Sequence, residues 1–269
     1  MPSANGGSAG TAPAVLYAVD SGIATVTLNR PERRNALSIA ASELLNDIWR
    51  EVDADGGVRA AVLTAADCGT FCAGMDLKEA AEIQRARHCD ILDVLPDPFH
   101  ERMRRVKKPI VAAMTGHFAA GGMVLSLNSD LRVGLAGSKG GITEAKVGRG
   151  SPWAVPLLWM LPQAILLEMT LTGEMVPVER LHALGFVNYV EPTPEAVRRR
   201  AYGLAERIRD NAPLTVQAGK ASLLAAMSLG CEAGFARAKE IYKPVYASED
   251  AQEGPRAFAE KRAPRWLGR

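Results

Sequence analysis

Two segments of the chain repeat one order of elements, and this repeat limits the fold more than any other feature of the sequence. In each segment a short apolar run of strand length leads into a glycine-containing turn and then into the start of a helix. The turns are residues 71–77 (FCAGMDL) and residues 116–123 (GHFAAGGM). Strands that alternate with helices in this way predict an α/β architecture in which helices cover the strands.

Local patterns outside these turns agree with an α/β chain. Alternating apolar residues predict a β-hairpin over residues 16–28, and Ser38 is a favourable N-cap for the helix that follows. From residue 193 onward the pattern is helical, which predicts a C-terminal helical appendage. The other expected elements are strands over 59–64, 110–114, 131–135 and 186–190, and a charged helix over 77–87.

Composition and charge exclude several classes of protein. The 269 residues are 48% hydrophobic and 23% charged, which is enough to bury a large core. A formal net charge of +2 provides no polyelectrolyte surface for a nucleic-acid partner. The four cysteines form neither a zinc pattern nor a disulfide framework, and the four histidines lack ligand spacing. We therefore expect a reduced, cytoplasmic protein without a metal ion.

Two uncharged stretches approach the length of a membrane span. Residues 109–129 contain glycines, His117 and Asn128, and residues 150–167 contain three prolines. These residues suit a lipid-facing helix poorly, so we expect both stretches to form buried interior and the protein to have no membrane contact. Residues 1–14 lack both a basic and an apolar segment and are expected to be a flexible leader.

The two glycine turns suggest a chemical use. A helix N-terminus leaves backbone N–H groups unpaired, and glycine allows another group to approach the backbone closely. Two such N–H groups aimed at one point form an oxyanion hole, which suits the enolate of a thioester. Phosphate loops, dinucleotide-binding loops, nucleophile elbows and metalloprotease motifs do not occur in the sequence. One turn of this kind is typical of plain packing, but the pair in this order favours a binding site.

Further motifs follow in a fixed order along the chain. They are Asn29-Arg30-Pro31, Asn35-Ala36-Leu37, the two glycine turns, Glu144 with Gly148, Leu171-Thr172-Gly173, residues 183–187 (ALGFV) and residues 248–262. In this set of motifs the chain resembles the crotonase, or enoyl-CoA hydratase/isomerase, superfamily from Val15 to its C-terminus. The resemblance implies a crotonase-like spiral of ββα turns over residues 15–192. It also implies a helical oligomerisation region over residues 193–269, which in the family builds homotrimers, often paired into hexamers.

The resemblance implies an acyl-CoA substrate, with no cofactor besides the coenzyme A that the substrate carries. The family's oxyanion N–H groups fall on Met75 and Gly121, and its acid/base falls on Glu144. Trp153 is expected either to form a wall of the acyl pocket or to be ordinary core. Contacts to substrate and coenzyme A are expected at Arg33, Asn35, Ala36, Ala73, Gly74, Asp76, Leu77, Lys78, Gly122, Val124, Trp153 and Lys261.

One position departs from the family's hydratases. They carry a second glutamate three residues after the oxyanion glycine, where this chain has Val124. Moving a double bond from carbon 3 to carbon 2 requires only one base, so Val124 favours a 3-enoyl-CoA to 2-enoyl-CoA isomerase. Hydration of a 2-enoyl-CoA requires that Glu144 act alone or that a second acid reach the site. The candidates for that acid are Glu79, Glu82, Asp90 and His117.

Similarity along the whole chain makes enoyl-CoA hydratase the leading hypothesis, with the isomerase as its close alternative. Decarboxylation or thioester hydrolysis at the same oxyanion hole is less favoured. A further alternative is a non-catalytic acyl-CoA- or RNA-binding relative. The retained glycine turns and Glu144 argue against this last hypothesis, because a relative without activity has no need for them.

Overall fold

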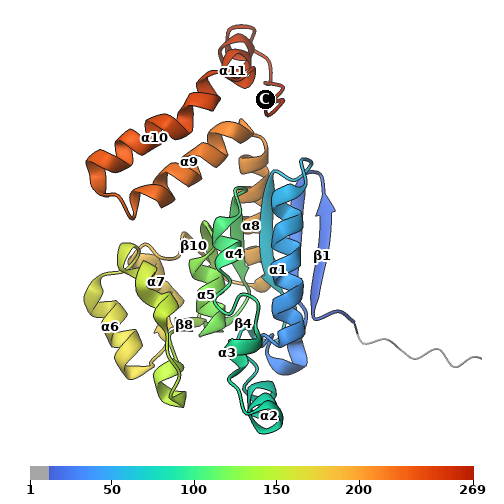
Figure 1. Ribbon diagram of the computed structural model, residues 1–269. Helices are drawn as coiled ribbons and strands as arrows, with labels where there is room; N and C mark the ends of the chain where they lie inside the picture. The colour runs from blue at the N-terminus through green and yellow to red at the C-terminus, as the bar shows by residue number, and fades with distance from the viewer. Residues whose placement is uncertain (1–11) are drawn as a thin grey trace, which may run out of the picture.

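The computed structural model describes residues 12–269, so most of the predicted leader, residues 1–14, lies outside the described residues. The larger of two sheets has six strands in the order β1-β2-β3-β5-β7-β10 (Figure 1). The first two strands form the expected antiparallel hairpin, and every later pair of neighbours in this sheet is parallel. These strands are β1 (Val15–Asp20), β2 (Ile23–Leu28), β3 (Ala60–Ala65), β5 (Ile110–Met114), β7 (Leu131–Leu135) and β10 (Tyr189–Glu191).

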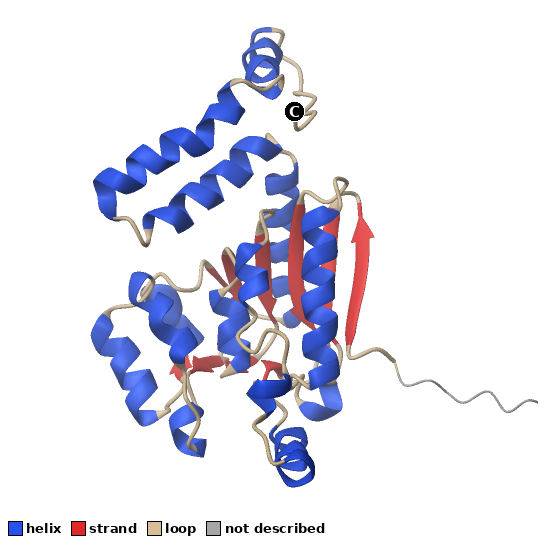
Figure 2. Cartoon of the chain, in the orientation of Figure 1, coloured by secondary structure: helices blue, strands red, loops and turns tan. Residues whose placement is uncertain are grey.

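A smaller sheet runs across the direction of the larger one (Figure 2). Its strands are β4 (Thr70–Cys72), β6 (His117–Ala119), β8 (Lys139–Gly141) and β9 (Val176–Pro177). The pairs β3–β4, β5–β6 and β7–β8 each place their first strand in the larger sheet and their second strand in the smaller sheet. Each pair leads into a helical segment, namely α2 (Leu77–Arg87), α5 (Gly121–Leu127) or the 3-10 helix η2 (Glu144–Val147). This repeat confirms the expected spiral of ββα turns.

The remaining helices cover the sheets and then extend away from them (Figure 1). Before the C-terminal region these are η1 (Pro31–Arg33), α1 (Ile39–Ala54), α3 (Ile91–Val94), α4 (Glu101–Arg105), η3 (Pro152–Trp159), α6 (Gln163–Thr172) and α7 (Val178–Ala183). The C-terminal region is helical, as expected, with α8 (Pro194–Arg209), α9 (Pro213–Ala226), α10 (Gly230–Tyr246) and α11 (Asp250–Ala259).

Local capping explains where two of these helices begin. The hydroxyl of Ser38 accepts a hydrogen bond from the backbone N–H of Ala41 at 3.1 Å, which confirms Ser38 as the N-cap of α1. The carboxylate of Asp76 accepts hydrogen bonds from the backbone N–H groups of Lys78 and Glu79 and caps α2 in the same way. Both helix starts therefore follow from short-range side-chain chemistry.

Two expectations about apolar segments require correction. The strand expected over residues 186–190 begins only at Tyr189. The backbone N–H groups of Phe186 and Val187 instead donate to the carbonyl of Leu181 in the turn after α7, and both residues are fully buried. Residues 109–129 form buried interior as expected, but residues 150–167 do so only in part. Their exposed fractions reach 57% at Val155 and 58% at Trp159. Within residues 12–269, no helix combines the length and apolar character needed to cross a membrane.

The first C-terminal helix packs on the larger sheet. Val197, Ala201 and Ala205 of α8 lie fully buried in one apolar cluster with Val62 and Val111 of the central strands. Helices α9, α10 and α11 then extend away from the sheets (Figure 1). The first helix of residues 193–269 thus contributes to the core, and the division of the chain at residue 192 stays a prediction.

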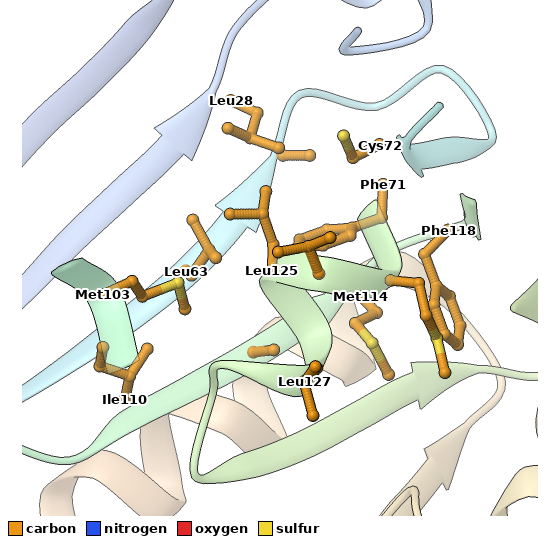
Figure 3. Close-up of a cluster of buried hydrophobic side chains, with 14 of the residues drawn as sticks. Leu28, Leu63, Phe71, Cys72, Met103, Ile110, Met114, Phe118, Leu125 and Leu127 are labelled. Atoms are coloured by element: carbon orange, nitrogen blue, oxygen red, sulfur yellow. The ribbon is translucent and has the colours of Figure 1, made fainter. Parts of the chain in front are cut away.

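The main core lies on the opposite face of the larger sheet. Figure 3 shows Leu63 and Met114 of the sheet directed toward Phe71, Phe118 and other apolar side chains around α5. Leu125, on α5, is fully buried in this cluster. Burial of apolar area is the main favourable term in folding, so this cluster fixes α5 against the two sheets.

A buried arginine fastens the C-terminal end of α5. The guanidinium of Arg132 donates from Nε to the carbonyl of Phe186 at 2.5 Å and from Nη1 to the carbonyls of Ser129 and Ser126 at 2.6 and 3.1 Å. Burial lowers the pKa of Arg132 to about 10, so the group stays charged at neutral pH. A cation at this end also complements the partial negative charge of the helix C-terminus. Because α5 begins at Gly121, this contact fixes the helix that carries the second glycine turn.

Arg132→Met is expected to lower the free energy of unfolding by about 3 kcal/mol, because it leaves buried carbonyl groups without donors. Urea unfolding followed by circular dichroism at fixed protein concentration measures the change. The control is Arg180→Met, since Arg180 forms an exposed ion pair with Glu168 and is expected to contribute no more than about 1 kcal/mol. Equal losses in the two variants would contradict the proposed role of Arg132.

Candidate functional site

A cavity of about 320 Å³ lies where the two glycine turns meet. Four parts of the chain supply its walls: the first glycine turn, the segment from α3 to α4, the start of α5, and residues 143–153. The residues around it are Leu37, Ser42, Ala73, Met75, Leu77, Leu92, Leu95, Pro98, Phe99, His100, Ala120, Gly121, Val124, Thr143, Glu144, Lys146, Val147, Arg149, Gly150 and Trp153. Most of these side chains are apolar, which suits an acyl group.

The backbones of the two glycine turns are in direct contact. Gly74 has φ +94°, and a Cβ atom placed on it would lie 2.8 Å from the Cβ of Ala120 and 3.1 Å from the nitrogen of Gly121. The first turn is held by Leu37, whose N–H donates to the carbonyl of Gly74 at 2.7 Å. Any side chain at position 74 would therefore push the turns apart, so glycine is required here.

Two backbone donors border the cavity beside this contact. Within residues 12–269, the N–H groups of Met75 and Gly121 make no hydrogen bond, and both residues line the cavity. Gly121 is the first residue of α5, where N–H groups have no partner within the helix. The preceding Ala120 has φ +50°, a strained value for a residue with a Cβ atom. The turns thus present two free donors to the same cavity, as an oxyanion hole requires.

Glu144 supplies a buried carboxyl group to the same cavity. Its side chain is 8% exposed, and Oε1 accepts a hydrogen bond from the indole N–H of Trp153 at 3.0 Å. Oε2 is buried and has no hydrogen-bond partner among residues 12–269. Burial raises the pKa of Glu144, and hydrogen bonds from the backbone of Glu144, from Trp153 and from the backbone of Thr143 oppose part of this rise. A raised pKa makes a carboxylate a stronger base, which suits a group that takes up and returns a proton.

The position of the missing second carboxylate is apolar. Val124 lies on α5, is 3% exposed and lines the cavity. None of the four residues considered as a substitute acid lines it. Glu79 accepts a hydrogen bond from the N–H of Ile39, Asp90 is paired with Arg149, and His117 is exposed. Glu144 is therefore the one carboxylate among the described residues of the cavity wall.

The structure brings together some of the residues expected to bind substrate. Ala73, Leu77, Val124 and Trp153 line the cavity with Met75, Gly121 and Glu144. Trp153 is both a wall of the cavity and part of the core, so the two expectations for it are compatible. The other expected contacts lie outside the cavity wall: Arg33, Asn35, Ala36, Gly74, Asp76, Lys78, Gly122 and Lys261.

Several residues of this second set support the glycine turns. The amide of Asn35 is buried and donates to the carbonyls of Ala66 and Thr70, both at 2.9 Å. Asp76 forms an ion pair with Arg30 at 2.9 Å as well as capping α2. Gly122 packs so closely that a Cβ atom there would lie 2.3 Å from the carbonyl oxygen of Cys72. The basic residues Arg33, Lys78 and Lys261, by contrast, have exposed side chains.

Sequence reasoning missed several polar residues of the cavity wall, namely Ser42, His100, Thr143, Lys146 and Arg149. His100 is 4% exposed, and burial lowers its pKa to about 4, so its ring is neutral at pH 7. Arg149 forms a two-pronged ion pair with Asp90, at 2.5 and 2.7 Å, and the hydrogen bonds from Arg149 lower the pKa of Asp90 to about 2. His100 reaches the cavity only in the folded chain, whereas Arg149 lies in the loop that follows Glu144.

Comparisons with known proteins identify the family to which this chain is similar. A family model described as Enoyl-CoA hydratase/isomerase matches residues 18–269. (E)-Benzylidenesuccinyl-CoA hydratase of Thauera aromatica is 37% identical over 263 residues, which cover 94% of this chain and 99% of that protein. Enoyl-CoA hydratase EchA19 of Mycobacterium tuberculosis is 36% identical over 250 residues, covering 91% of this chain and 92% of that protein.

Solved structures give the same result for the fold. Enoyl-CoA hydratase EchA1 of Mycobacterium marinum matches with a TM-score of 0.87 and 38% identity, over 96% of this chain and 100% of that chain. An enoyl-CoA hydratase of Mycobacterium tuberculosis H37Rv matches with a TM-score of 0.84 and 37% identity, over the same shares. The expected crotonase-like fold, with its helical C-terminal region, is confirmed.

The buried ring of His100 is expected to make stability depend on pH. Its pKa is about 4 in the folded protein and 6.5 in an unfolded chain, so the unfolded chain takes up a proton first as the pH falls. The contribution of His100 to the free energy of unfolding is fully present above pH 6.5 and decreases as the pH falls toward 4. The decrease is about 2 kcal/mol at pH 4.5. His100→Asn should remove this part of the decrease in unfolding free energy between pH 7.5 and 4.5.

Asparagine suits this test because His100 has φ +51°, a conformation that asparagine tolerates. His88→Asn is the matched control, since His88 has φ +53° and an exposed side chain. The same pH dependence in the wild type and in His100→Asn would contradict the assignment.

Proposed function

Because this chain belongs to the enoyl-CoA hydratase/isomerase family, we propose that its cavity binds a 2-enoyl-CoA and adds water across the double bond. One observation carries the proposal: the free N–H groups of Met75 and Gly121 border the same cavity as the buried carboxyl of Glu144. The hydratase names of the relatives described above support this choice of reaction.

The thioester carbonyl oxygen would accept hydrogen bonds from the N–H groups of Met75 and Gly121. Negative charge develops on that oxygen as the enolate forms, and donors that are already in place stabilise it without reorganisation. Glu144 would take a proton from a water molecule whose oxygen bonds to carbon 3, and would return that proton to carbon 2. One water molecule then supplies both added groups, and the carboxylate is regenerated.

Isomerisation is the second candidate, and Val124 favours it. An apolar side chain at this position cannot hold or activate a water molecule. In a 3-enoyl-CoA, Glu144 alone would take the proton from carbon 2 and return it to carbon 4, while the same N–H groups stabilise the dienolate. The enzymatic character of the family leaves the non-catalytic alternative without support.

The coenzyme A part of the substrate would lie outside the acyl cavity. Arg33, Lys78 and Lys261 have exposed side chains and are our candidates for its phosphates, because basic groups suit phosphate oxygens. The apolar walls from Leu92 to Phe99 would enclose the acyl chain. No cofactor besides the substrate's own coenzyme A enters this reaction.

The protein is expected to form a homotrimer or a pair of trimers. Large apolar side chains are exposed on its C-terminal helices, with exposed fractions of 74% at Leu223, 64% at Phe235 and 87% at Phe258. Apolar surface of this kind is typical of an interface between subunits. Sedimentation equilibrium at micromolar concentration should give three or six times the 28.7 kDa chain mass. A monomer under these conditions would contradict this assembly.

The reaction is tested by offering a 2-enoyl-CoA and, separately, a 3-enoyl-CoA to the purified protein. Absorbance of the conjugated thioester falls on hydration of the first and rises on isomerisation of the second. Glu144→Gln should lower kcat by a factor of about 10² to 10⁴ in the reaction that the wild type catalyses. Glu82→Gln, at an exposed position on α2, is the control and should keep full activity. Wild-type protein that changes neither thioester is inconsistent with both candidate reactions.

A further inference from the structure

Trp153 is the one side chain among residues 12–269 that forms a hydrogen bond with the carboxyl of Glu144. Its indole N–H donates to Oε1 at 3.0 Å, and both side chains are only 8% exposed. The two residues come from successive 3-10 helices, η2 and η3, and both line the cavity. The contact is therefore shielded from solvent. A hydrogen bond to a carboxylate is stronger in such a buried place than in water.

The rest of the loop holds the backbone of Glu144. The backbone N–H of Arg149 donates to the carbonyl of Glu144 at 3.0 Å, across a turn at Gly148 with φ +66°. This contact holds the backbone but does not fix the side-chain torsions of Glu144. The carboxyl group is directed by Trp153, the one side chain bonded to it, together with hydrogen bonds from the backbone of Glu144 and Thr143.

We propose that Trp153 is a positioning residue that assigns different roles to the two carboxyl oxygens of Glu144. An indole N–H can donate a hydrogen bond but cannot accept one, so Oε1 must remain an acceptor. The proton that Glu144 takes up and returns is then carried on Oε2, which has no partner among the described residues. This inference rests on the proposed function and applies to either candidate reaction, because both use Glu144 as the proton carrier.

If Trp153 were only a wall of the cavity, its substitution would have a different effect. A wall changes how the acyl chain binds and therefore acts on KM, whereas a hydrogen bond to the proton carrier acts on kcat and on the pH profile. A donor to the charged form favours the carboxylate, so its loss should raise the pKa of Glu144 further above its usual value. The acid limb of the pH profile should then move to higher pH.

The test compares Trp153→Phe with the wild type, using whichever thioester the wild type converts. We expect kcat to fall about tenfold, KM to change less than about threefold, and the acid limb to move to higher pH. Trp159→Phe is the matched control, since Trp159 lies on the same 3-10 helix, is 58% exposed and lies outside the cavity wall. It should leave all three quantities unchanged.

A second variant removes the donor without changing the size of the ring. Replacement of Trp153 by β-(3-benzothienyl)alanine substitutes sulfur for the N–H group, so the cavity wall and the core packing are retained. This variant should reproduce the loss in kcat and the shift of the acid limb. A change in KM alone, in either variant, would overturn the proposal and leave Trp153 as a wall.

A measurement without substrate separates this proposal from the proposed function. The infrared carboxyl band of Glu144, identified by its loss in Glu144→Gln, is titrated in the apo wild type and in the benzothienyl variant. We expect the band to titrate at higher pH in the variant, and titration at the same pH in both proteins would overturn the role of Trp153. Wild-type protein that converts neither thioester would instead contradict the proposed function, whatever the band shows.

Discussion

The close contact between the backbones of Gly74 and Gly121 is the constraint on which the site depends. The two glycine turns connect the small sheet to α2 and α5, so their contact forces two successive turns of the spiral together at one point. The buried amide of Asn35 holds the first turn, and Arg132 holds the far end of the helix that begins at the second. Buried polar contacts of this kind are costly to leave incomplete, so the donors of the cavity sit on a rigid frame.

The cavity wall carries a single carboxyl group, that of Glu144. Val124 and the neutral ring of His100 add no charge to this wall, and burial is the largest cause of the raised pKa of Glu144. In the proposed reaction, the free donors would stabilise negative charge on the substrate, while the carboxyl of Glu144 would transfer the proton. These two functions come from separate segments of the chain, which meet only in the folded protein.

Features set by neighbouring residues could be predicted from the sequence. The hairpin, the cap at Ser38 and the two glycine turns all have short-range causes, and the resemblance placed Met75, Gly121 and Glu144 at one site. His100 could not be found in this way, because contacts between distant segments bring it to the cavity. Arg149 lies in the same loop as Glu144, but its pairing with Asp90 is a contact between distant segments. The expectation that residues 150–167 form interior was correct only in part. Apolar composition alone does not distinguish a core segment from an exposed apolar surface.

The ion pair between Asp90 and Arg149 links two parts of the cavity wall. Asp90 caps α3, whose residue Leu92 lines the cavity, while Arg149 closes the loop that carries Glu144. On the proposed function, a substitution that reshapes the cavity through α3 should also affect the loop that holds Glu144. The shape of the cavity and the transfer of the proton would then be linked properties of this chain.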